Sequence, residues 1–577
     1  MGTGPYHKWL GIPTEEQPPP NHYRLLAIPQ FESDSDVIET AAERPASQGT
    51  HRASGTGRNI QQKSTSMRIA FIAAVTGLIV GPLASAAEQP NIILMMTDDH
   101  GWGDVGFNGN TDIITPNLDR VCEQGARLHY FFAAAPVCSP TRGSVLTGRH
   151  YYRYGIWGAN DGRLPRQEYS IAQGLKDVGY TTGHFGKWHV GSPHPDYRGK
   201  GGRGNADRLA LPQWFGYDKH FVTHHAVCTW NPYGDDGSKG ATTDNPYWED
   251  GKRVVERLVG DDTKVIMDRV IPFVEQASKD DKPFLSVIWT HTPHSPLRAG
   301  PEYRKLYEDK GLTGKLLNYY GAITALDEQV GRLENRLREL GEWENTMFWF
   351  CADNGPASHI RQGGHGKTDG MRGKKAHLFN GGTCVPAFVC WPGRVKPGIT
   401  IRTPMSTMDY LPTAFAVAGA KMPDDRPVDG DNVLDIILGK TDRRARPIPF
   451  RFSNDNAPGL GLLDGDFRYY TNFDSNAPEG DLLYNFVADR GEQDNLIQQM
   501  PAVASQMRKH ALAFIASCRS SYAGSDYPDG YEPLGKWKTM KNTPWEAPPP
   551  TAGKKNKRKR ARRGLPSEDN TRAKERQ

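Results

Sequence analysis

The stretch Cys138-Ser139-Pro140-Thr141-Arg142 decides how the rest of the sequence is interpreted, and it continues as Gly143-Ser144-Val145-Leu146-Thr147-Gly148-Arg149. Pro140 is tolerated in the first turn of a helix, and Ser139 before it is predicted to cap that helix. A helix N-terminus attracts anions, and Arg142 adds a planar, permanently charged partner for sulfate or phosphate. The stretch predicts an anion site with Cys138 at its mouth, as a nucleophile or as the precursor of one. The alternative is a buried cysteine before an ordinary capped helix.

Three predicted strands end in polar clusters, which favours the anion site. The continuous apolar run Asn91–Thr97 leads to Asp98-Asp99, Phe284–Thr290 leads to His291 and His294, and Thr346–Cys351 leads to Asp353-Asn354. Ligands gather at the carboxyl ends of strands in open α/β sheets. Paired carboxylates there indicate a site for a hard cation, although a single Asp-Asp pair also suits a solvated turn.

Further candidate residues follow weaker signals. The predicted strand Tyr180–Phe185 delivers Lys187 and His189 at its end, where both can face an anion. Predicted helices cover Thr115–Gly125, capped by Thr115, then Ser170–Val178, Asp262/Thr263–Ser278, Leu317–Leu340 and Ala502–Ser517. From about Arg446 short alternating runs replace the buried strands, which indicates a smaller α+β domain.

Composition and targeting signals bound the class of protein. The 577 residues suffice for two domains. Met67-Arg68, the apolar run Ile69–Val80 and Ala84-Ser85-Ala86 have the layout of a signal peptide, which predicts a secreted or periplasmic protein. The expected organisation is a polar extension 1–66, a signal peptide 67–87, a catalytic domain 88–445, a C-terminal subdomain 446–545 and a disordered basic tail 546–577. The extension is explained either by a mis-called start at Met1, with Met67 as the true first residue, or by a cytoplasmic segment.

The net charge and the cysteines bear on possible partners and on disulfides. The net charge is +5, but Thr551–Gln577 alone holds 11 Lys and Arg against 3 Asp and Glu, so the remainder is acidic and no nucleic-acid partner is expected. The tail itself is either solvated or a hook for anionic polymers. With Cys138 reserved for chemistry, six cysteines remain, and both disulfides and buried free thiols are open.

Taken together, these motifs resemble the type I sulfatases, the arylsulfatase-like branch of the alkaline phosphatase superfamily. The resemblance spans roughly Asn91 to Leu496. It includes Thr115-Pro116-Asn117-Leu118-Asp119, Leu146-Thr147-Gly148-Arg149, Gly186-Lys187-Trp188-His189, Pro293-His294, Asp353-Asn354-Gly355 and Trp391-Pro392-Gly393. It implies a large mixed, mostly parallel sheet flanked by helices, with a smaller C-terminal α+β domain.

The resemblance also implies a chemistry. Cys138 is converted by a formylglycine-generating maturation enzyme to formylglycine, whose hydrate attacks a sulfate ester and forms a covalent sulfo-enzyme intermediate. One divalent metal, Ca²⁺ given oxygen ligands, is held by Asp98, Asp99, Asp353 and Asn354 together with the modified Cys138. Arg142 and Lys187 neutralise charge, His189 is the base for sulfate elimination, and His294 and Lys375 contact the sulfate and help protonate the leaving alcohol.

The sequence departs from the family pattern at two positions. Asn380 and Cys384 replace the usual Glu and Arg, which is neutral if that pair is structural and affects specificity if it borders the leaving group. The expected substrates are aryl sulfates or sulfated saccharides. The alternatives are a phosphate or phosphonate ester hydrolase on the same fold, and a sulfated-glycan-binding protein without turnover.

Overall fold

The structure is a computed structural model that describes residues 89–197, 199, 208–232, 245–357, 366–452, 459–471 and 480–527. The predicted extension, signal peptide and basic tail lie outside the described residues. The described residues all belong to one compact unit, Pro82–Gln577. Among them, no helix is long and apolar enough to cross a membrane.

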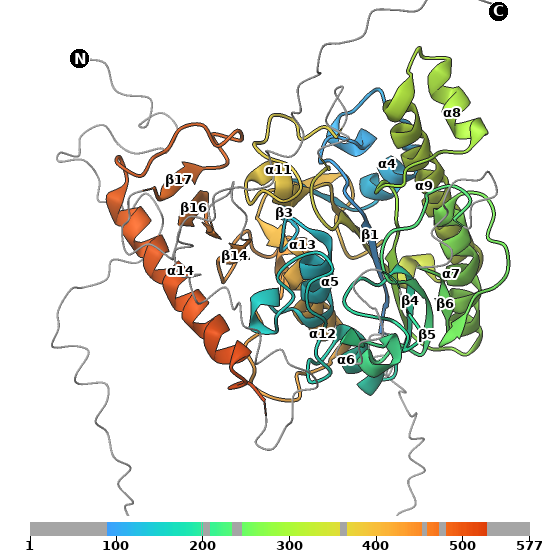
Figure 1. The fold of residues 1–577 in the computed structure, drawn as a ribbon, viewed down its shortest axis with the longest axis horizontal. Coiled ribbons are helices and arrows are strands. Elements are labelled where there is room, and N and C mark those ends of the chain that lie inside the picture. The colour runs from blue at the N-terminus through green and yellow to red at the C-terminus, as the bar shows by residue number, and fades with distance from the viewer. Residues whose placement is uncertain are drawn as a thin grey trace, which may run out of the picture. The chain divides into compact units, whose positions relative to one another are not determined.

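A ten-stranded sheet with the order β12-β2-β11-β9-β1-β8-β4-β5-β6-β7 forms the centre of the molecule (Figure 1). Its strands are β1 (Asn91–Thr97), β2 (Ala126–Leu128), β4 (Thr181–Lys187), β5 (Lys219–Thr223), β6 (Trp248–Glu249), β7 (Lys252–Arg253), β8 (Phe284–Trp289), β9 (Thr346–Ala352), β11 (Phe388–Cys390) and β12 (Ile399–Ile401). The five central strands β9, β1, β8, β4 and β5 run parallel, whereas β11 and β6 pair antiparallel with their neighbours. The predicted mixed, mostly parallel sheet is confirmed.

Helices cover both faces of this sheet because the side chains of β1 alternate between two cores. Ile93 and Met95 pack with α4 (Pro116–Glu123), α7 (Asp262–Lys279) and α9 (Gly314–Glu339). Ile92, Leu94 and Met96 pack with α5 (Cys138–Thr147), α6 (Ile171–Asp177) and α12 (Tyr410–Ala418). Both faces of β1 are therefore buried, as the continuous apolar run predicts.

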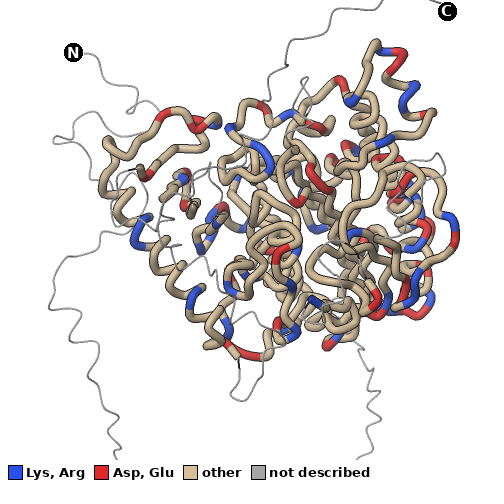
Figure 2. The backbone as a smooth tube through the Cα atoms, viewed as in Figure 1, with Lys and Arg blue, Asp and Glu red and all other residues tan. Residues whose placement is uncertain are grey.

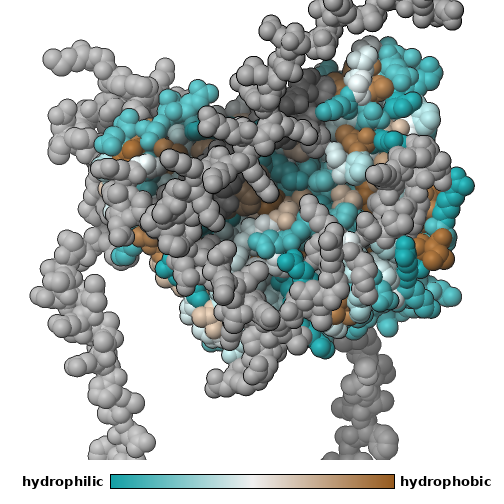
Figure 3. Space-filling view, viewed as in Figure 1, coloured by the Kyte–Doolittle hydropathy of each residue, from teal (hydrophilic) through white to brown (hydrophobic). Residues whose placement is uncertain are grey.

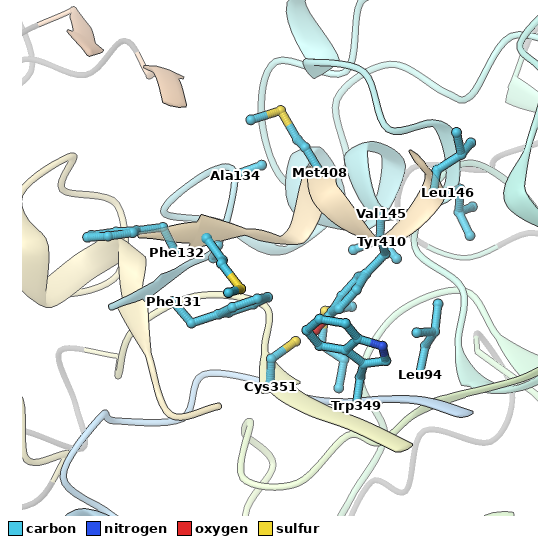
Figure 4. Close-up of a cluster of buried hydrophobic side chains, with 14 of the residues drawn as sticks. Leu94, Phe131, Phe132, Ala134, Val145, Leu146, Trp349, Cys351, Met408 and Tyr410 are labelled. Atoms are coloured by element: carbon cyan, nitrogen blue, oxygen red, sulfur yellow. The ribbon is translucent and has the colours of Figure 1, made fainter. Parts of the chain in front are cut away.

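The core beneath α5 fixes the position of this helix (Figure 4). Val145 and Leu146 of α5 lie over Leu94 of β1 and Trp349 of β9, with Tyr410 of α12 between them. Full burial of each such aliphatic side chain contributes about 1.5–3 kcal/mol. The N-terminus of α5 is thus held at the carboxyl end of the central strands.

Smaller elements complete the fold. A three-stranded sheet contains β3 (Phe131–Phe132), β10 (Cys384–Val385) and β13 (Met405–Ser406), and short helices are α8 (Pro301–Glu308), α11 (Asn380–Thr383) and α13 (Leu434–Ile437). A four-stranded antiparallel sheet follows in the C-terminal part, with β14 (Ile448–Arg451), β15 (Leu460–Asp464), β16 (Phe467–Thr471) and β17 (Leu482–Asn485). Helix α14 (Pro501–Tyr522) packs on it, so the predicted smaller α+β part is confirmed, whereas its boundary at 445/446 stays a prediction.

Charges of both signs are interspersed along α8 and α9 (Figure 2), and the surface over α8 is mostly hydrophilic (Figure 3). Several helix ends differ from the prediction. Helix α9 begins at Gly314 instead of Leu317, and α14 ends at Tyr522 instead of Ser517. Asp261 caps α7 in place of Asp262 or Thr263, since its carboxylate accepts from Lys264 N. Helix α4 ends at Glu123 instead of Gly125. Thr115 is its N-cap residue as predicted, but it makes no capping hydrogen bond, and its Oγ1 accepts from Gly106 N at 2.8 Å instead. All seven cysteines are buried free thiols, so none of them forms a disulfide.

Candidate active site

The first residue of α5 is Cys138 itself. Its N-cap is Val137, with extended backbone (φ −149°, ψ 155°) and no side-chain capping bond. The predicted capping role of Ser139 is therefore wrong, because Ser139 is already inside the helix and its Oγ accepts from Asn160 N at 3.2 Å. Pro140 stays within the first turn, where its missing N–H costs no helical bond. The Cys138 side chain consequently leaves the helix at its anion-attracting end.

The acidic residues predicted as metal ligands come together beside Cys138. Asp98 and Asp99 follow β1, Asp353 and Asn354 follow β9, and these strands are parallel neighbours. Asp99 N donates to Asp353 Oδ1 at 3.2 Å, and Asn354 Nδ2 donates to Asp99 Oδ1 at 2.7 Å. Asp99 takes a left-handed backbone (φ 63°), which turns the chain sharply at the strand end. All four side chains are buried.

Three predicted cationic side chains neutralise these carboxylates. Lys187 Nζ lies 2.6 Å from Asp98 Oδ2, and Lys375 Nζ lies 2.6 Å from Asp99 Oδ1 and 3.6 Å from Cys138 Sγ. Arg142 is fully buried and donates through Nε and Nη2 to Asp353 Oδ2, at 3.1 and 2.7 Å. The carboxylates and cations form one compact network around Cys138.

The electrostatics keep the Cys138 thiol protonated. Burial, and then the carboxylates of Asp353 and Asp98, raise the pKa of Cys138. Burial alone would also raise the pKa of Asp98, but Lys187 and the other cations outweigh it and hold that pKa well below its ordinary value. Cys138 Sγ donates to Asp98 Oδ1 at 3.3 Å. Because the thiolate is the nucleophilic form of cysteine, the unmodified side chain is poorly suited to attack.

The acidic cluster fits a bound cation. Asn354 Oδ1 is buried and has no hydrogen-bond partner, and the Nδ2 of the same side chain donates to the buried Asp99 carboxylate. Asp98, Asp99, Cys138 and His294 also offer ligand atoms within 4.8 Å of one another. An orphaned amide oxygen beside buried carboxylates satisfies the oxygen preference of a hard divalent ion such as Ca²⁺. Sequence reasoning did not place His294 in this group.

The two predicted histidines occupy different sides of the site. His294 is partly exposed, and its Nε2 lies 3.5 Å from Asp99 Oδ2. His189 is buried, and its Nε2 lies 3.0 Å from Asn160 Oδ1 rather than against the carboxylates. Burial, and then Lys187, hold the pKa of His189 well below its ordinary value, so its imidazole is neutral and can accept a proton.

Asn160, and the contacts that hold His291, were not predicted from the sequence. Asn160 holds His189 and also contacts Ser139, but only the turn-forming Asn160-Asp161-Gly162 hints at its special backbone (φ 61°). His291 Nδ1 lies 2.7 Å from Asp262 Oδ2 and its Nε2 lies 2.8 Å from Thr223 Oγ1. His291 O accepts from His294 N at 2.7 Å, so this buried network positions the loop that carries His294.

The two departures from the family pattern lie inside the protein. Asn380 and Cys384 are both buried. Asn380 Oδ1 accepts a hydrogen bond from Arg468 of β16, and Asn380 N donates to Glu492 Oε2 at 2.7 Å. Arg468 and Glu492 belong to the C-terminal part of the chain. Asn380 therefore joins α11 to the small sheet.

Known proteins are similar to this chain in sequence and in fold. The profile of the Sulfatase family matches residues 90–420. Arylsulfatase G of Rattus norvegicus is 31% identical over 394 residues, which cover 62% of this chain and 70% of the relative. N-acetylgalactosamine-6-sulfatase of Canis lupus familiaris is 30% identical over 434 residues, which cover 71% of this chain and 77% of the relative.

Solved structures agree with the family match. Ps i-CgsB in complex with k-i-k-neocarrahexaose is 25% identical and superposes with a TM-score of 0.64, covering 74% of this chain and 92% of that structure. The phosphonate monoester hydrolase of Agrobacterium radiobacter shares the fold alone, with a TM-score of 0.52 and 19% identity. The matching family profile and relatives, together with this arrangement of carboxylates, cations and histidines around Cys138, show that the chain belongs to the sulfatase family and is a sulfuric ester hydrolase.

Proposed function

We propose that this sulfatase removes sulfate from sulfated saccharides, that formylglycine made from Cys138 is its nucleophile, and that one Ca²⁺ completes the site. The observation that carries the proposal is the placement of Cys138. It stands at the first position of α5, with Asp98 Oδ1 at 3.3 Å and Lys375 Nζ at 3.6 Å from its sulfur. A protonated, buried thiol in this position has no evident role of its own, whereas a precursor does.

Formation of formylglycine replaces the thiol sulfur of Cys138 by oxygen and removes two electrons. The conversion therefore requires an oxidant delivered by a maturation enzyme. Once hydrated, the aldehyde supplies two hydroxyl groups, one to attack sulfur and one to expel sulfate afterwards. Asp98, Asp99, Asp353 and Asn354 would hold the Ca²⁺, which supplies charge stabilisation for a sulfate oxygen and for the ionised hydroxyl.

Arg142 and Lys187 fix the charge of the site. Arg142 is held by Asp353 and by Lys187 O, to which its Nη1 donates at 3.1 Å. Its guanidinium also lies over the Trp289 ring, 5.1 Å from the centroid. This three-sided support keeps the cation oriented before substrate arrives, which is the condition for electrostatic stabilisation of a transition state.

Proton transfer is divided between the two sides of the site. His294 and Lys375, both partly exposed and both in contact with Asp99, contact the sulfate and help protonate the leaving alcohol. His189 is buried and neutral, with Nε2 on Asn160 and Nδ1 without a partner. It accepts the proton of the second hydroxyl when sulfate is expelled.

Named relatives support saccharide substrates. N-acetylgalactosamine-6-sulfatase carries a sugar in its name, and Ps i-CgsB was solved with a neocarrahexaose. The apolar run Ile69–Val80 before Ala87 supports export, so we propose a secreted or periplasmic enzyme.

Parallel assays test the proposal. Protein produced with a formylglycine-generating enzyme is given 4-nitrophenyl sulfate, 4-nitrophenyl phosphate and a panel of sulfated saccharides. The expected result is faster turnover of the sulfate than of the phosphate, with desulfation of at least one saccharide, and loss of both activities in Cys138→Ala. Faster phosphate turnover points to a phosphate ester hydrolase, and saccharide binding without any turnover points to a non-catalytic glycan-binding protein.

A further inference from the structure

A second cationic surface lies at the same edge of the large sheet as the active site. We call it the His129 surface, and it contains Trp102, Arg127, His129, Arg402 and Arg490. Strand β11 is antiparallel to both β9 and β2, and β12 is parallel to β2, so β2 and β12 run in the direction of β1. His129 follows β2 and Arg402 follows β12, and His129 N donates to Ile401 O at 2.9 Å. Both residues therefore lie at the carboxyl edge, where the catalytic groups also gather.

Aromatic rings organise the His129 surface. The Arg490 guanidinium lies over the Trp102 ring, 4.0 Å from its centroid, and His129 packs edge-on against the same ring at 5.5 Å. Trp102 belongs to the loop that follows Asp98 and Asp99, so this surface and the active site share one loop. Arg127 donates to Phe107 O and to Thr400 Oγ1, at 3.3 Å each, which restrains its side chain.

The charges of this surface are incompletely balanced. The carboxylate of Asp369 lies 3.3 Å from Arg490, whereas Arg127 and Arg402 have no carboxylate partner within the described part of the chain. Arg402 is exposed, and Arg127, His129 and Arg490 are half-buried. His129 Nδ1 and Arg490 Nε are buried atoms without a hydrogen-bond partner. Burial, then Arg402, Arg490 and Arg127, lower the pKa of His129 to about 4, which agrees with three guanidinium groups converging on one ring.

The separation between the His129 surface and the active site indicates the kind of ligand. Strands β2 and β12, which precede His129 and Arg402, are three and four steps from β1 in the sheet, which corresponds to about 14–19 Å at the usual spacing of ~4.8 Å. A small sulfate ester bound at Cys138 does not reach that far, whereas a sulfated polysaccharide does. We propose that the His129 surface binds a second sulfate group of a polymeric sulfated saccharide while another sulfate occupies the active site. This inference rests on the proposed saccharide substrate and makes that substrate a polymer.

The test measures binding of the full chain to dextran sulfate, with neutral dextran as the comparison, at several salt concentrations. The double variant Arg127→Gln/Arg402→Gln removes two of the cations. We expect about tenfold weaker binding of dextran sulfate near 0.1 M salt. The slope of the logarithm of the binding constant against the logarithm of the salt concentration should be smaller in magnitude by about two, since each charge contact releases roughly one counterion. All proteins keep the same C-terminal tail, so they differ from wild type only in the replaced side chains.

Matched controls keep the result interpretable. Lys421→Gln/Arg443→Gln removes two exposed charges elsewhere, and it is expected to leave the affinity within about twofold. Arg490→Gln is a second, independent variant and is expected to weaken binding as well. Turnover of 4-nitrophenyl sulfate should stay unchanged in every variant. If the wild type itself shows no turnover, that result counts against the proposed function and not against binding at the His129 surface. Wild-type affinity for dextran sulfate in both His129-surface variants, or an equal loss in the control, would overturn the inference.

Discussion

Arg142 and Asp353 form an ion pair with no solvent exposure on either side chain, in which two guanidinium nitrogens share one carboxylate oxygen. The other oxygen, Asp353 Oδ1, accepts from Asp99 N. The pair therefore joins α5, β9 and the turn after β1. A buried ion pair is a weak source of stability because desolvation offsets the Coulombic gain, so its main effect here is to fix the orientation of Arg142.

We predict that Arg142→Lys lowers kcat for 4-nitrophenyl sulfate by about 10²–10³-fold, the usual range for loss of one preorganised donor group. Lysine keeps the charge but cannot make the three directed hydrogen bonds to Asp353 and Lys187 O. Steady-state kinetics measures the effect. The half-exposed Arg332→Lys serves as the control and should keep wild-type kcat. A kcat within twofold of wild type in Arg142→Lys would refute the role of the directed bonds.

The second prediction concerns metal removal. Treatment with EGTA should abolish turnover and lower Tm, and added Ca²⁺ should restore both. Saturation at 100-fold above Kd stabilises a folded protein by about 2.7 kcal/mol. Asn354→Leu removes the orphaned Oδ1 and should weaken the Ca²⁺-dependent shift in Tm. A shift of wild-type size in Asn354→Leu would show that Asn354 is not a ligand.

His189 and His294 should affect different steps. We predict that His189→Ala gives a burst of alcohol close to one equivalent, followed by turnover about 10²–10⁴-fold slower, because release of sulfate lacks its base. His294→Ala should slow the first turnover itself and give no burst. Rapid-mixing measurements of 4-nitrophenol separate the two. Identical burst amplitudes in the two variants would contradict this division of roles.

Asp261 should make the stability of the protein depend on pH. Burial, and then Asp262, raise the pKa of Asp261 to about 8. Since the unfolded pKa is near 4, the folded state binds the extra proton in between, and stability falls as pH rises from about 4 to about 8. Asp261→Asn still caps α7, and its stability relative to wild type should increase between pH 5 and pH 9 by at least ~1.4 kcal/mol, which corresponds to one pKa unit.

Thermal unfolding at pH 5 and pH 9 measures this difference, with the exposed Asp309→Asn as the control. The control should differ from wild type by the same small amount at both values. An Asp261→Asn protein whose Tm difference from wild type is the same at pH 5 and pH 9 would show that Asp261 ionises normally.

Strand positions were predictable because their signal is local. The run Asn91–Thr97 reads as a doubly buried strand and is β1 with those bounds. Strands β4, β8 and β9 likewise begin or end within two residues of the prediction. Parallel neighbouring strands bring their carboxyl ends together, so the sequence alone was enough to group Asp98, Asp99, Asp353 and Asn354. The predicted helix cap at Ser139 lies two residues beyond the observed cap at Val137, because a serine before a proline is a strong capping signal and a valine is not.

Contacts between distant parts of the chain could not be predicted in the same way. Asn160 reaches His189 across 29 residues, and Arg468 reaches Asn380 across 88. Neither pair leaves a pattern along the sequence, because their meeting depends on how loops and the small sheet pack. The Asp262–His291–Thr223 network is similar, since only His291 stands at a predicted strand end.

The central claim is that Cys138 acts after conversion to formylglycine. Mass spectrometry of the tryptic peptide Leu128–Arg142, taken from protein made with a formylglycine-generating enzyme and assayed on 4-nitrophenyl sulfate in parallel, tests it most directly. We predict an aldehyde at position 138, reactive toward a hydrazide probe, in an amount proportional to activity. Full turnover by protein whose Cys138 is entirely unmodified thiol would contradict the account.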